Sequence, residues 1–331
     1  MSSESKGSRT TTRTITLEEH FGTPVFIEGP GRWFKERPQS AQLLEKLCDL
    51  GDIRIADMDS AGIDMQVLSL AAPGLELSDE AEAIELARVT NDILADAVQR
   101  HPTRFAGFAI LPPASPDTAA DELERMVSKH NFKGAIINGH TKGRYLDDEF
   151  FWPILERAEA LKVPIYLHPT QPPEPVIEAY YTGNFSAEVK GLLSTAGWGW
   201  HIETAVHVLR LILSGALDRY PSLQIIIGHL GEALPFMLPR INRNLPMAVT
   251  KLNRPLEAYL RENLHYTFAG FNFLPTFLDL LLQVGVSRII FSADYPFGSM
   301  SAALAFLDQI PVSPADKESI AHGNAELLLG L

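Results

Sequence analysis

Cysteine and long apolar runs are both scarce in this chain of 331 residues. Cys48 is the only cysteine, so the chain cannot form an internal disulfide, and a reducing compartment such as the cytoplasm is expected. No segment reaches the roughly 20 consecutive apolar residues that a membrane-spanning helix needs. The first residues, MSSESKGSRTTTRT, lack the apolar core of a signal peptide, and residues 1–11 are expected to form a disordered tail.

Basic residues are also few. The sequence has 28 Lys and Arg against 41 Asp and Glu, which gives a formal net charge of −13. A nucleic-acid-binding protein needs a basic face to neutralise phosphates, so this balance argues against DNA or RNA as a partner. A small anionic substrate remains compatible, because a bound metal and a few local cations can reverse the field inside a cleft.

What the chain does contain is a repeated unit of a short β-branched run, a polar loop and an amphipathic helix. The predicted strands are Thr14–His20, Met65–Leu70, Phe105–Leu111, Gly134–Asn138, Pro164–His168, Leu223–Gly228, Leu264–Thr267 and Arg288–Ser292. The predicted helices include Asp79–Gln99 with Ser78 as its N-cap, Asp117–His130, Asp148–Leu161, Ile202–Leu213 and Leu274–Val284. Eight such units predict a (β/α)8 barrel, the TIM-barrel fold, over residues 12–331 as a single domain. An open doubly wound sheet is the alternative, but no Gly-rich phosphate loop follows the first strand.

Two predicted loops are unusually long. They cover Gly22–Gln42 after the first strand and Thr170–His201 after the fifth. Loops that follow the strands build the active-site face of a barrel, so both are expected to form walls of a pocket.

Acidic and imidazole side chains follow several predicted strands at the point where each strand ends. Glu18 and His20 end the first strand, His168 ends the fifth, His229 follows the sixth and Asp294 follows the eighth. A lone histidine after a strand is commonly a hydrogen-bonded structural residue. Four strand ends that all supply Glu, His or Asp instead favour a metal site. Such a set of carboxylates and imidazoles suits Zn²⁺ or Mn²⁺ and leaves a position open for substrate.

The first strand should place its polar residues toward the mouth of the barrel. Alternation divides its side chains between two faces: Thr14, Thr16, Glu18 and His20 on one, and Ile15 and Leu17 on the other. The apolar face is expected to meet the outer helices. Glu19 is out of the inward register and is expected to face solvent or a helix.

Four strings spread along the chain resemble the amidohydrolase superfamily: TLEEHF, YLHP, GHLGEALPF and FSADYPF. Within it they look like the non-oxidative aromatic acid decarboxylases, such as the γ-resorcylate and 2,3-dihydroxybenzoate decarboxylases. The resemblance extends to RIADMDSAGID, ETAVHVLRLILSG and NAELLLGL, and covers roughly Thr14–Leu331.

This resemblance implies roles for individual residues. It makes four of them ligands of one divalent metal ion, Mn²⁺ or Zn²⁺: Glu18, His20, His168 and Asp294. It makes His229 an active-site histidine off the metal, oriented by Glu232. Arg240 becomes a substrate contact that can reach a neighbouring subunit, because the family forms dimers or tetramers. Some hydroxybenzoate decarboxylases have Ala in place of His20. No lysine at a strand end is a candidate for carboxylation, which favours a single metal. No organic cofactor is expected.

The expected reaction is the loss of CO2 from an ortho-hydroxylated benzoate, with Asp294 as the acid that protonates the ring. Aromatic rings of Phe297 and Trp198 are candidates to sandwich the substrate, with loop packing as the alternative. The same ligands also suit a metal-dependent hydrolase of a lactone, amide or C–C bond, with Asp294 as general base. A non-catalytic barrel that serves as a binding partner is a third possibility. Among the other histidines, His201 is expected at the surface or in a loop, and His265 in the core.

Overall fold

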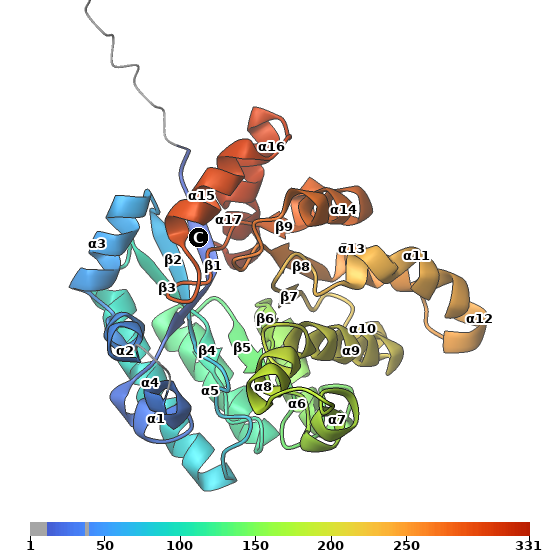
Figure 1. Ribbon diagram of the computed structural model, residues 1–331, viewed down its shortest axis with the longest axis horizontal. Helices are drawn as coiled ribbons and strands as arrows, with labels where there is room; N and C mark the ends of the chain where they lie inside the picture. The colour runs from blue at the N-terminus through green and yellow to red at the C-terminus, as the bar shows by residue number, and fades with distance from the viewer. Residues whose placement is uncertain (1–11, 37–39) are drawn as a thin grey trace, which may run out of the picture.

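Parallel strands alternate with helices around a closed ring in the computed structural model of this protein (Figure 1). The structure describes residues 12–36 and 40–331, and the tail predicted at residues 1–11 lies outside this part. The strands are β1 (Ile15–Phe21), β2 (Met65–Leu70), β3 (Phe105–Gly107), β4 (Ala109–Ile110), β5 (Ala135–Asn138), β6 (Ile165–His168), β7 (Ile225–Ile227), β8 (Leu264–Thr267) and β9 (Ile289–Ile290).

The ring is closed by two short links between the sheets β1–β3 and β4–β9. Only Phe108 separates β3 from β4, and its amide donates to the carbonyl of Leu68 at 2.9 Å, so these two strands occupy one position of the barrel. A parallel bridge between Leu17 and Ser292 joins β1 to β9. Every neighbouring pair of strands is parallel. The described residues therefore form the predicted eight-position barrel.

Helices surround this ring and also cover its two ends. The first half of the chain contains α1 (Pro24–Glu28), η1 (Arg32–Glu36), α2 (Ser40–Cys48), α3 (Asp52–Ala61), α4 (Glu80–Arg100), α5 (Pro116–His130), η2 (Glu149–Phe151) and α6 (Trp152–Leu161). Further along the chain lie α7 (Glu174–Tyr180), α8 (Ala187–Ser194), α9 (Gly199–Leu213), α10 (Ala216–Arg219), α11 (Leu234–Asn244), α12 (Met247–Thr250), α13 (Leu256–Glu262), α14 (Leu274–Val284), η3 (Val286–Arg288), α15 (Met300–Gln309), α16 (Pro314–Glu318), η4 (Ser319–Gly323) and α17 (Asn324–Leu329). None of the described helices is long and apolar enough to cross a membrane.

Two expectations about local structure need correction. The N-cap of α4 is Asp79 and not Ser78, and its side chain makes no capping hydrogen bond, so acids in the first turn are what favour this helix end. The two long segments predicted as loops contain helices. The first holds α1, η1 and the start of α2, and the second holds α7, α8 and the start of α9.

The barrel interior corrects the predicted orientation of the first strand. Ile15 and Leu17 point inward and belong to an apolar cluster that fills the barrel: Val67, Ala106, Phe108, Ile136, Tyr166, Ile226 and Ile290. An irregularity in the pairing of β1 with β2 falls between Thr16 and Glu19, and Glu18 there has φ 65°. This bulge resets the alternation, so Glu18 and His20 face the interior although Leu17 does too.

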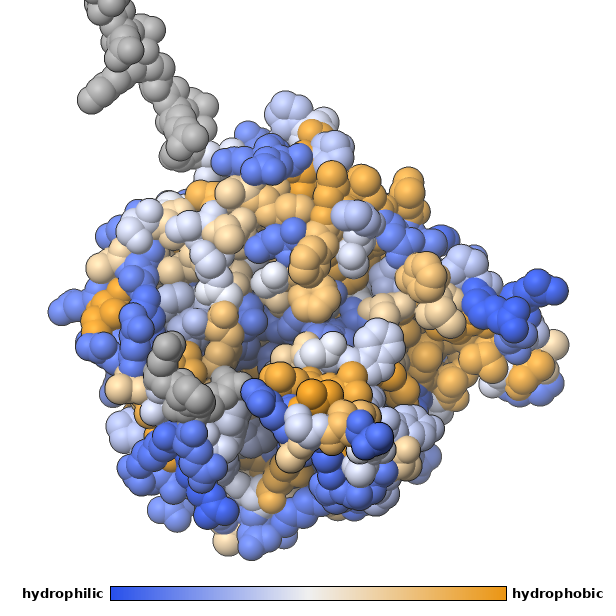
Figure 2. Space-filling view, viewed as in Figure 1, coloured by the Kyte–Doolittle hydropathy of each residue, from blue (hydrophilic) through white to orange (hydrophobic). Residues whose placement is uncertain are grey.

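The exterior carries exposed hydrophobic side chains beside the end of the barrel that holds the strand C-termini. Figure 2 shows them gathered over α8 and around α11 and α12, near a hollow in the centre of the view. Leu192 on α8 is 62% exposed and Phe236 on α11 is 76% exposed. Patches of this kind are typical of surfaces that contact another molecule.

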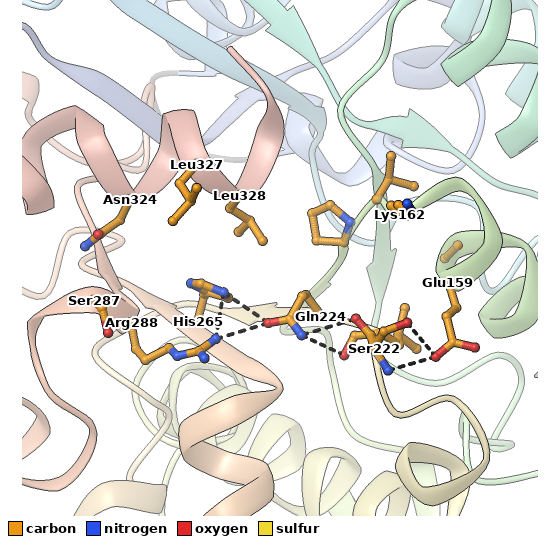
Figure 3. A pocket seen from close by; sticks show the side chains of 14 residues that line it. Glu159, Lys162, Ser222, Gln224, His265, Ser287, Arg288, Asn324, Leu327 and Leu328 are labelled. Atoms are coloured by element: carbon orange, nitrogen blue, oxygen red, sulfur yellow. Dashed lines mark hydrogen bonds between the residues drawn. The ribbon is translucent and has the colours of Figure 1, made fainter.

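The opposite end of the barrel is covered by α17. Ala325 and Leu329 pack against the interior apolar cluster from below. A cavity of about 450 Å³ opens beside this helix, between it and the first residues of β6 to β9 (Figure 3). A hydrogen-bonded row that includes Arg288, His265 and Gln224 lies across the cavity from Leu327 and Leu328 of α17.

Candidate metal centre and active site

Three polar side chains converge where β1 and β6 end. The ligand atoms of Glu18, His20 and His168 all lie within 4.8 Å of one another, and all three residues are buried. Nε2 of His168 is 3.3 Å from Oε1 of Glu18. Asp294, in the loop after β9, places Oδ1 3.4 Å from Nε2 of His20. The four residues predicted as metal ligands therefore meet at one site, although they come from three separate strands.

Glu18 is held by contacts to one of its two oxygens. Its Oε2 accepts hydrogen bonds from the hydroxyl groups of Tyr166 and of Thr267, the latter at 3.0 Å. Its Oε1 is buried and has no hydrogen-bond partner among the described residues. Gly228 makes room for the carboxylate, because a Cβ at that position would lie 2.5 Å from Oε2. The glycine that precedes His229 is therefore needed for close packing over Glu18.

The donor set fits a divalent cation. A buried carboxylate oxygen without a partner is costly unless a cation or a donor approaches it, and the free Oε1 of Glu18 faces two imidazoles. Metal bonds of about 2.0–2.2 Å bring neighbouring ligand atoms to roughly 3 Å from one another, close to the spacings of 3.3 and 3.4 Å found here. Burial opposes the charged form of Glu18, but the positive charge of His229 and the close approach of His168 at 3.3 Å outweigh it and lower its pKa to about 2. The carboxylate of Glu18 is thus ionised, the form that binds a cation most strongly.

Asp294 is positioned by backbone contacts on both sides. It has φ 62°, a left-handed conformation that is costly for a residue with a side chain. The carboxylate of Glu19 accepts hydrogen bonds from the amides of Ala293 at 2.9 Å and Tyr295 at 3.1 Å, which flank Asp294. The expectation that Glu19 faces solvent or a helix is wrong: it is fully buried, and it fixes the loop that carries Asp294.

The protonation of Asp294 is unusual. Burial, followed by the negative charge of Glu18, raises the pKa of Asp294 well above its usual range. Its side chain is nevertheless 21% exposed, so one edge of the carboxyl group can be reached from outside. A carboxyl group that takes up a proton readily and can be reached is what a general acid requires.

A left-handed turn positions His229 and Glu232. Five consecutive residues from His229 to Ala233 have φ between 51° and 96°. The turn brings Nδ1 of His229 to 2.7 Å from Oε1 of Glu232, and it leaves Nε2 of His229 3.8 Å from Oε1 of Glu18. Glu232 does not cap α11, since Ala233 is the N-cap residue of that helix. The predicted pair is therefore in contact, beside the candidate metal ligands and not among them.

His201 is a residue that sequence reasoning missed. It was expected at the surface or in a loop, yet it lies in the first turn of α9 with its Nδ1 2.6 Å from Oε2 of Glu232. The aromatic ring of Phe271 contacts both His201 and His229, with centroid distances of 5.0 and 5.1 Å. No spacing in the sequence indicates that His201 contacts Glu232, because the two residues are 31 positions apart and meet only in the folded protein. The only local hint is that His201 lies two residues before the ETAVHVLRLILSG string.

The three residues predicted to contact substrate are placed differently from one another. Phe297 lies beside the site, with its ring centroid 5.6 Å from that of His20 and 5.9 Å from that of Phe34. Trp198 is 51% exposed at the N-cap of α9. Arg240 is exposed on α11, and within the described part of the chain its side chain has no contact with the candidate ligands.

Comparison with known proteins places these features in context. Residues 41–331 match the model of a family described as amidohydrolase. The chain is 38% identical over 328 residues to a γ-resorcylate decarboxylase of Polaromonas sp. strain JS666, a match that covers 96% of this chain and 98% of the relative.

Two solved structures are similar over nearly their whole length. One is a dihydroxybenzoic acid decarboxylase from Polaromonas sp. JS666 with manganese and the inhibitor 2-nitroresorcinol; it is 37% identical with a TM-score of 0.89, covering 97% of this chain and 98% of that one. The other is a 5-carboxyvanillate decarboxylase from Novosphingobium aromaticivorans with manganese and 4-hydroxy-3-methoxy-5-nitrobenzoic acid. It is 34% identical with a TM-score of 0.90, covering 98% of each chain.

Proposed function

The chain belongs to the amidohydrolase family, and we propose that it is a metal-dependent lyase that removes CO2, without oxidation, from an aromatic acid with a hydroxyl group ortho to its carboxylate. The observation that carries this proposal is Asp294: a partly exposed carboxyl group with a raised pKa, whose Oδ1 lies 3.4 Å from Nε2 of the candidate ligand His20. Hydrolysis needs a base to activate water, whereas decarboxylation of an aryl acid needs an acid to protonate the ring. The state of Asp294 favours the second reaction.

The molecules bound to the similar structures support the same substrate class. 2-Nitroresorcinol and 4-hydroxy-3-methoxy-5-nitrobenzoic acid both carry a nitro group ortho to a hydroxyl group. A nitro group is planar and has two oxygens, so it imitates a carboxylate that cannot be lost. We infer that this chain also accepts a ring with a carboxylate beside a phenol oxygen.

Glu18, His20, His168 and Asp294 would hold the metal, and Mn²⁺ is favoured over Zn²⁺ because the two similar structures contain manganese. When bound, a divalent cation supplies a positive centre that orients the carboxylate and the ortho oxygen and favours the ionised phenol. The site has no need of an organic cofactor for this chemistry. One such ion per chain is proposed.

The residues of the chain then carry the proton. The acid proton of Asp294 passes to the ring carbon that bears the carboxylate, while the ortho phenolate supplies electron density to the ring. The bond between that carbon and the carboxylate breaks next, its electron pair restores the aromatic ring, and CO2 leaves. Asp294 is left as a carboxylate that must be reprotonated. His229, oriented by Glu232, donates a hydrogen bond to a substrate oxygen from Nε2.

Substrate contacts and assembly complete the proposal. Phe297 would cover one face of the ring, since it already packs beside His20, and Trp198 would come from the wall built by α8 and α9. We place Arg240 in the pocket of a second copy of the chain, because it is exposed on α11 together with Phe236. A homodimer or homotetramer is the assembly this requires. A location in the cytoplasm is proposed from the single free Cys48.

The test is a panel of hydroxybenzoates with metal-loaded and chelator-treated protein. 2,6-Dihydroxybenzoate and other ortho-hydroxybenzoates should release CO2 and the matching phenol, and chelation should abolish this. 4-Hydroxybenzoate should be inert, and turnover of that compound would contradict the ortho requirement. Lack of turnover with every ortho-hydroxybenzoate, or entry of oxygen from labelled water into a product, would overturn the lyase in favour of a hydrolase.

A further inference from the structure

We infer that His201 is a positioning residue of the active site, which fixes Glu232 and, through Glu232, the ring of His229. This inference rests on the proposed function only for its kinetic consequence. The contacts themselves are independent of which reaction is catalysed.

The core of the argument is a carboxylate shared by two imidazoles. Oε1 of Glu232 lies 2.7 Å from Nδ1 of His229, and Oε2 lies 2.6 Å from Nδ1 of His201. Glu232 itself is 1% exposed, so water does not replace either contact. These are direct hydrogen-bond distances, too short to leave an ion between the groups. Each oxygen of the carboxylate is thus assigned to one histidine.

The two hydrogen-bond partners of His201 fix the orientation of its ring. An ionised carboxylate can only accept a hydrogen bond, and the same is true of a backbone carbonyl. Nδ1 of His201 faces Glu232, while Nε2 faces the carbonyl of Ala196 at 3.1 Å. Each ring nitrogen of His201 therefore faces an acceptor, and the ring is held at both edges. It cannot rotate without losing two hydrogen bonds.

The charge on Glu232 agrees with this arrangement. Burial opposes the charged carboxylate, but the charge of His229 and the hydrogen bond from His201 outweigh it and lower the pKa of Glu232. A charge-assisted hydrogen bond on each oxygen leaves the carboxylate with one preferred orientation.

Packing transmits this orientation to His229. The rings of His201 and His229 meet edge to face with centroids 4.7 Å apart, and Phe271 packs against both. His229 then has only Nε2 free, and that atom points toward Glu18 at 3.8 Å. Loss of His201 would leave Oε2 of Glu232 buried without a donor, so the carboxylate would rotate to find one and release His229. The expected damage is to turnover and not to substrate binding.

Two substitutions at position 201 separate this role from simple packing. The side-chain amide of His201→Asn lies close to the position of Nδ1 and can still donate to Glu232. The longer His201→Gln reaches the position of Nε2 and can donate to Ala196, but not to Glu232. With 2,6-dihydroxybenzoate and metal-loaded protein, His201→Gln should lower kcat by about tenfold with KM changed by less than about twofold, and His201→Asn should restore most of kcat. Equal losses in the two variants, or native kcat in His201→Gln, would overturn the inference.

A double-mutant cycle tests whether His201 acts through Glu232. Glu232→Gln should reduce kcat by itself, and adding His201→Gln should then cause little further loss, because the bond is already altered. Fully additive losses would contradict the route. The matched control is His207→Gln, on the same helix, where Nε2 of His207 accepts from the amide of Leu146 at 2.9 Å. It should lower stability and leave kcat unchanged.

A spectroscopic readout keeps the inference testable if no hydroxybenzoate is turned over. That result would reject the proposed function, but NMR of ring-labelled histidines would still report the contacts. His201→Gln should shift the Nδ1 signal of His229, whereas His207→Gln should leave that signal unchanged. An unchanged His229 signal in His201→Gln would overturn the inference whatever the reaction.

Discussion

The two ends of the barrel each contain an inward-facing, buried histidine, and the two are opposite in character. At the C-terminal end of the strands, burial disfavours the charged ring of His229, but the carboxylates of Glu232 and Glu18 outweigh it and raise its pKa to about 10. At the other end, burial and the positive charge of Arg288 lower the pKa of His265 to about 3. Burial is similar in both places, so the charge of the neighbours decides which form of the ring is stable.

The same contrast holds for the surroundings. Around His229 the side chains are candidate metal ligands and acids, whereas His265 lies within hydrogen-bond distance of Arg288 and Gln224 beside a cavity (Figure 3). The backbone also differs between the two ends. Positive φ angles occur at Glu18, His229, Glu232 and Asp294, whereas His265 has none. Conformations that cost energy are kept where chemistry is expected.

The largest effect is expected from a substitution that removes the acid at the C-terminal end of the strands. Asp294→Asn keeps the size of the side chain and one ligand oxygen, but an amide cannot donate an acid proton. Decarboxylation should fall by about two to four orders of magnitude in protein whose metal content is unchanged. With the product phenol in D2O, the native enzyme should exchange hydrogen for deuterium at the ring carbon that loses CO2, and the variant should not. Exchange at the native rate would move the acid role elsewhere, with His229 as the first alternative.

A matched pair of substitutions tests the comparison directly. His229→Asn should lower turnover by roughly a hundredfold with metal retained, because the hydrogen bond to substrate is lost. His265→Asn at the opposite end should leave turnover near the native value and reduce only the free energy of unfolding. Steady-state kinetics and denaturant titration of both variants supply the measurements. If the two variants lost turnover to the same extent, the functional division between the ends would be wrong.

The opposite end of the barrel, where His265 lies, should affect how the free energy of unfolding depends on pH. The pKa of His265 is lowered to about 3, so it stays neutral in the folded state while the unfolded chain binds a proton near pH 6.5. Its contribution to stability is complete above about pH 6.5 and is lost as pH falls toward 3. His265→Gln should therefore make the free energy of unfolding less dependent on pH in this window. Identical pH profiles in the native protein and the variant would show that His265 is not held neutral.

The smallest effect is expected in the left-handed turn from His229 to Ala233, at the C-terminal end of the strands. Ala233 has φ 64° and is exposed, and a left-handed conformation costs a residue with a Cβ about 1–2 kcal/mol. Ala233→Gly removes that cost but adds freedom to the unfolded chain, so a net stabilisation of about 0.5 kcal/mol is expected without a change in turnover. Thermal unfolding can detect it. A destabilised variant would mean that the methyl group has a packing role.

The barrel and the convergence of its polar strand ends were predictable because both follow from patterns that recur along the chain. Met65–Leu70 and Leu264–Thr267 have the predicted bounds, and the expected ligands do meet. The register of β1 was not predictable, because simple alternation carries no sign of the left-handed Glu18. His201 was missed for another reason: its partner Glu232 lies on a different element, and only the closed fold brings the two together.

The join between β1 and β9 has a consequence for synthesis of the protein. A chain leaves the ribosome N-terminus first, so β1 must wait for nearly the entire sequence before Ser292 can pair with Leu17. Until then both β1 and β8 are open edges, which invite pairing with other chains. Glu18 follows Leu17 in β1, and Asp294 follows Ser292 after β9. An ion bound by both side chains would therefore stabilise the pairing that closes the barrel. Fragments that stop before β9 are therefore expected to aggregate, and half-barrels of this protein should not serve as independent metal-binding modules.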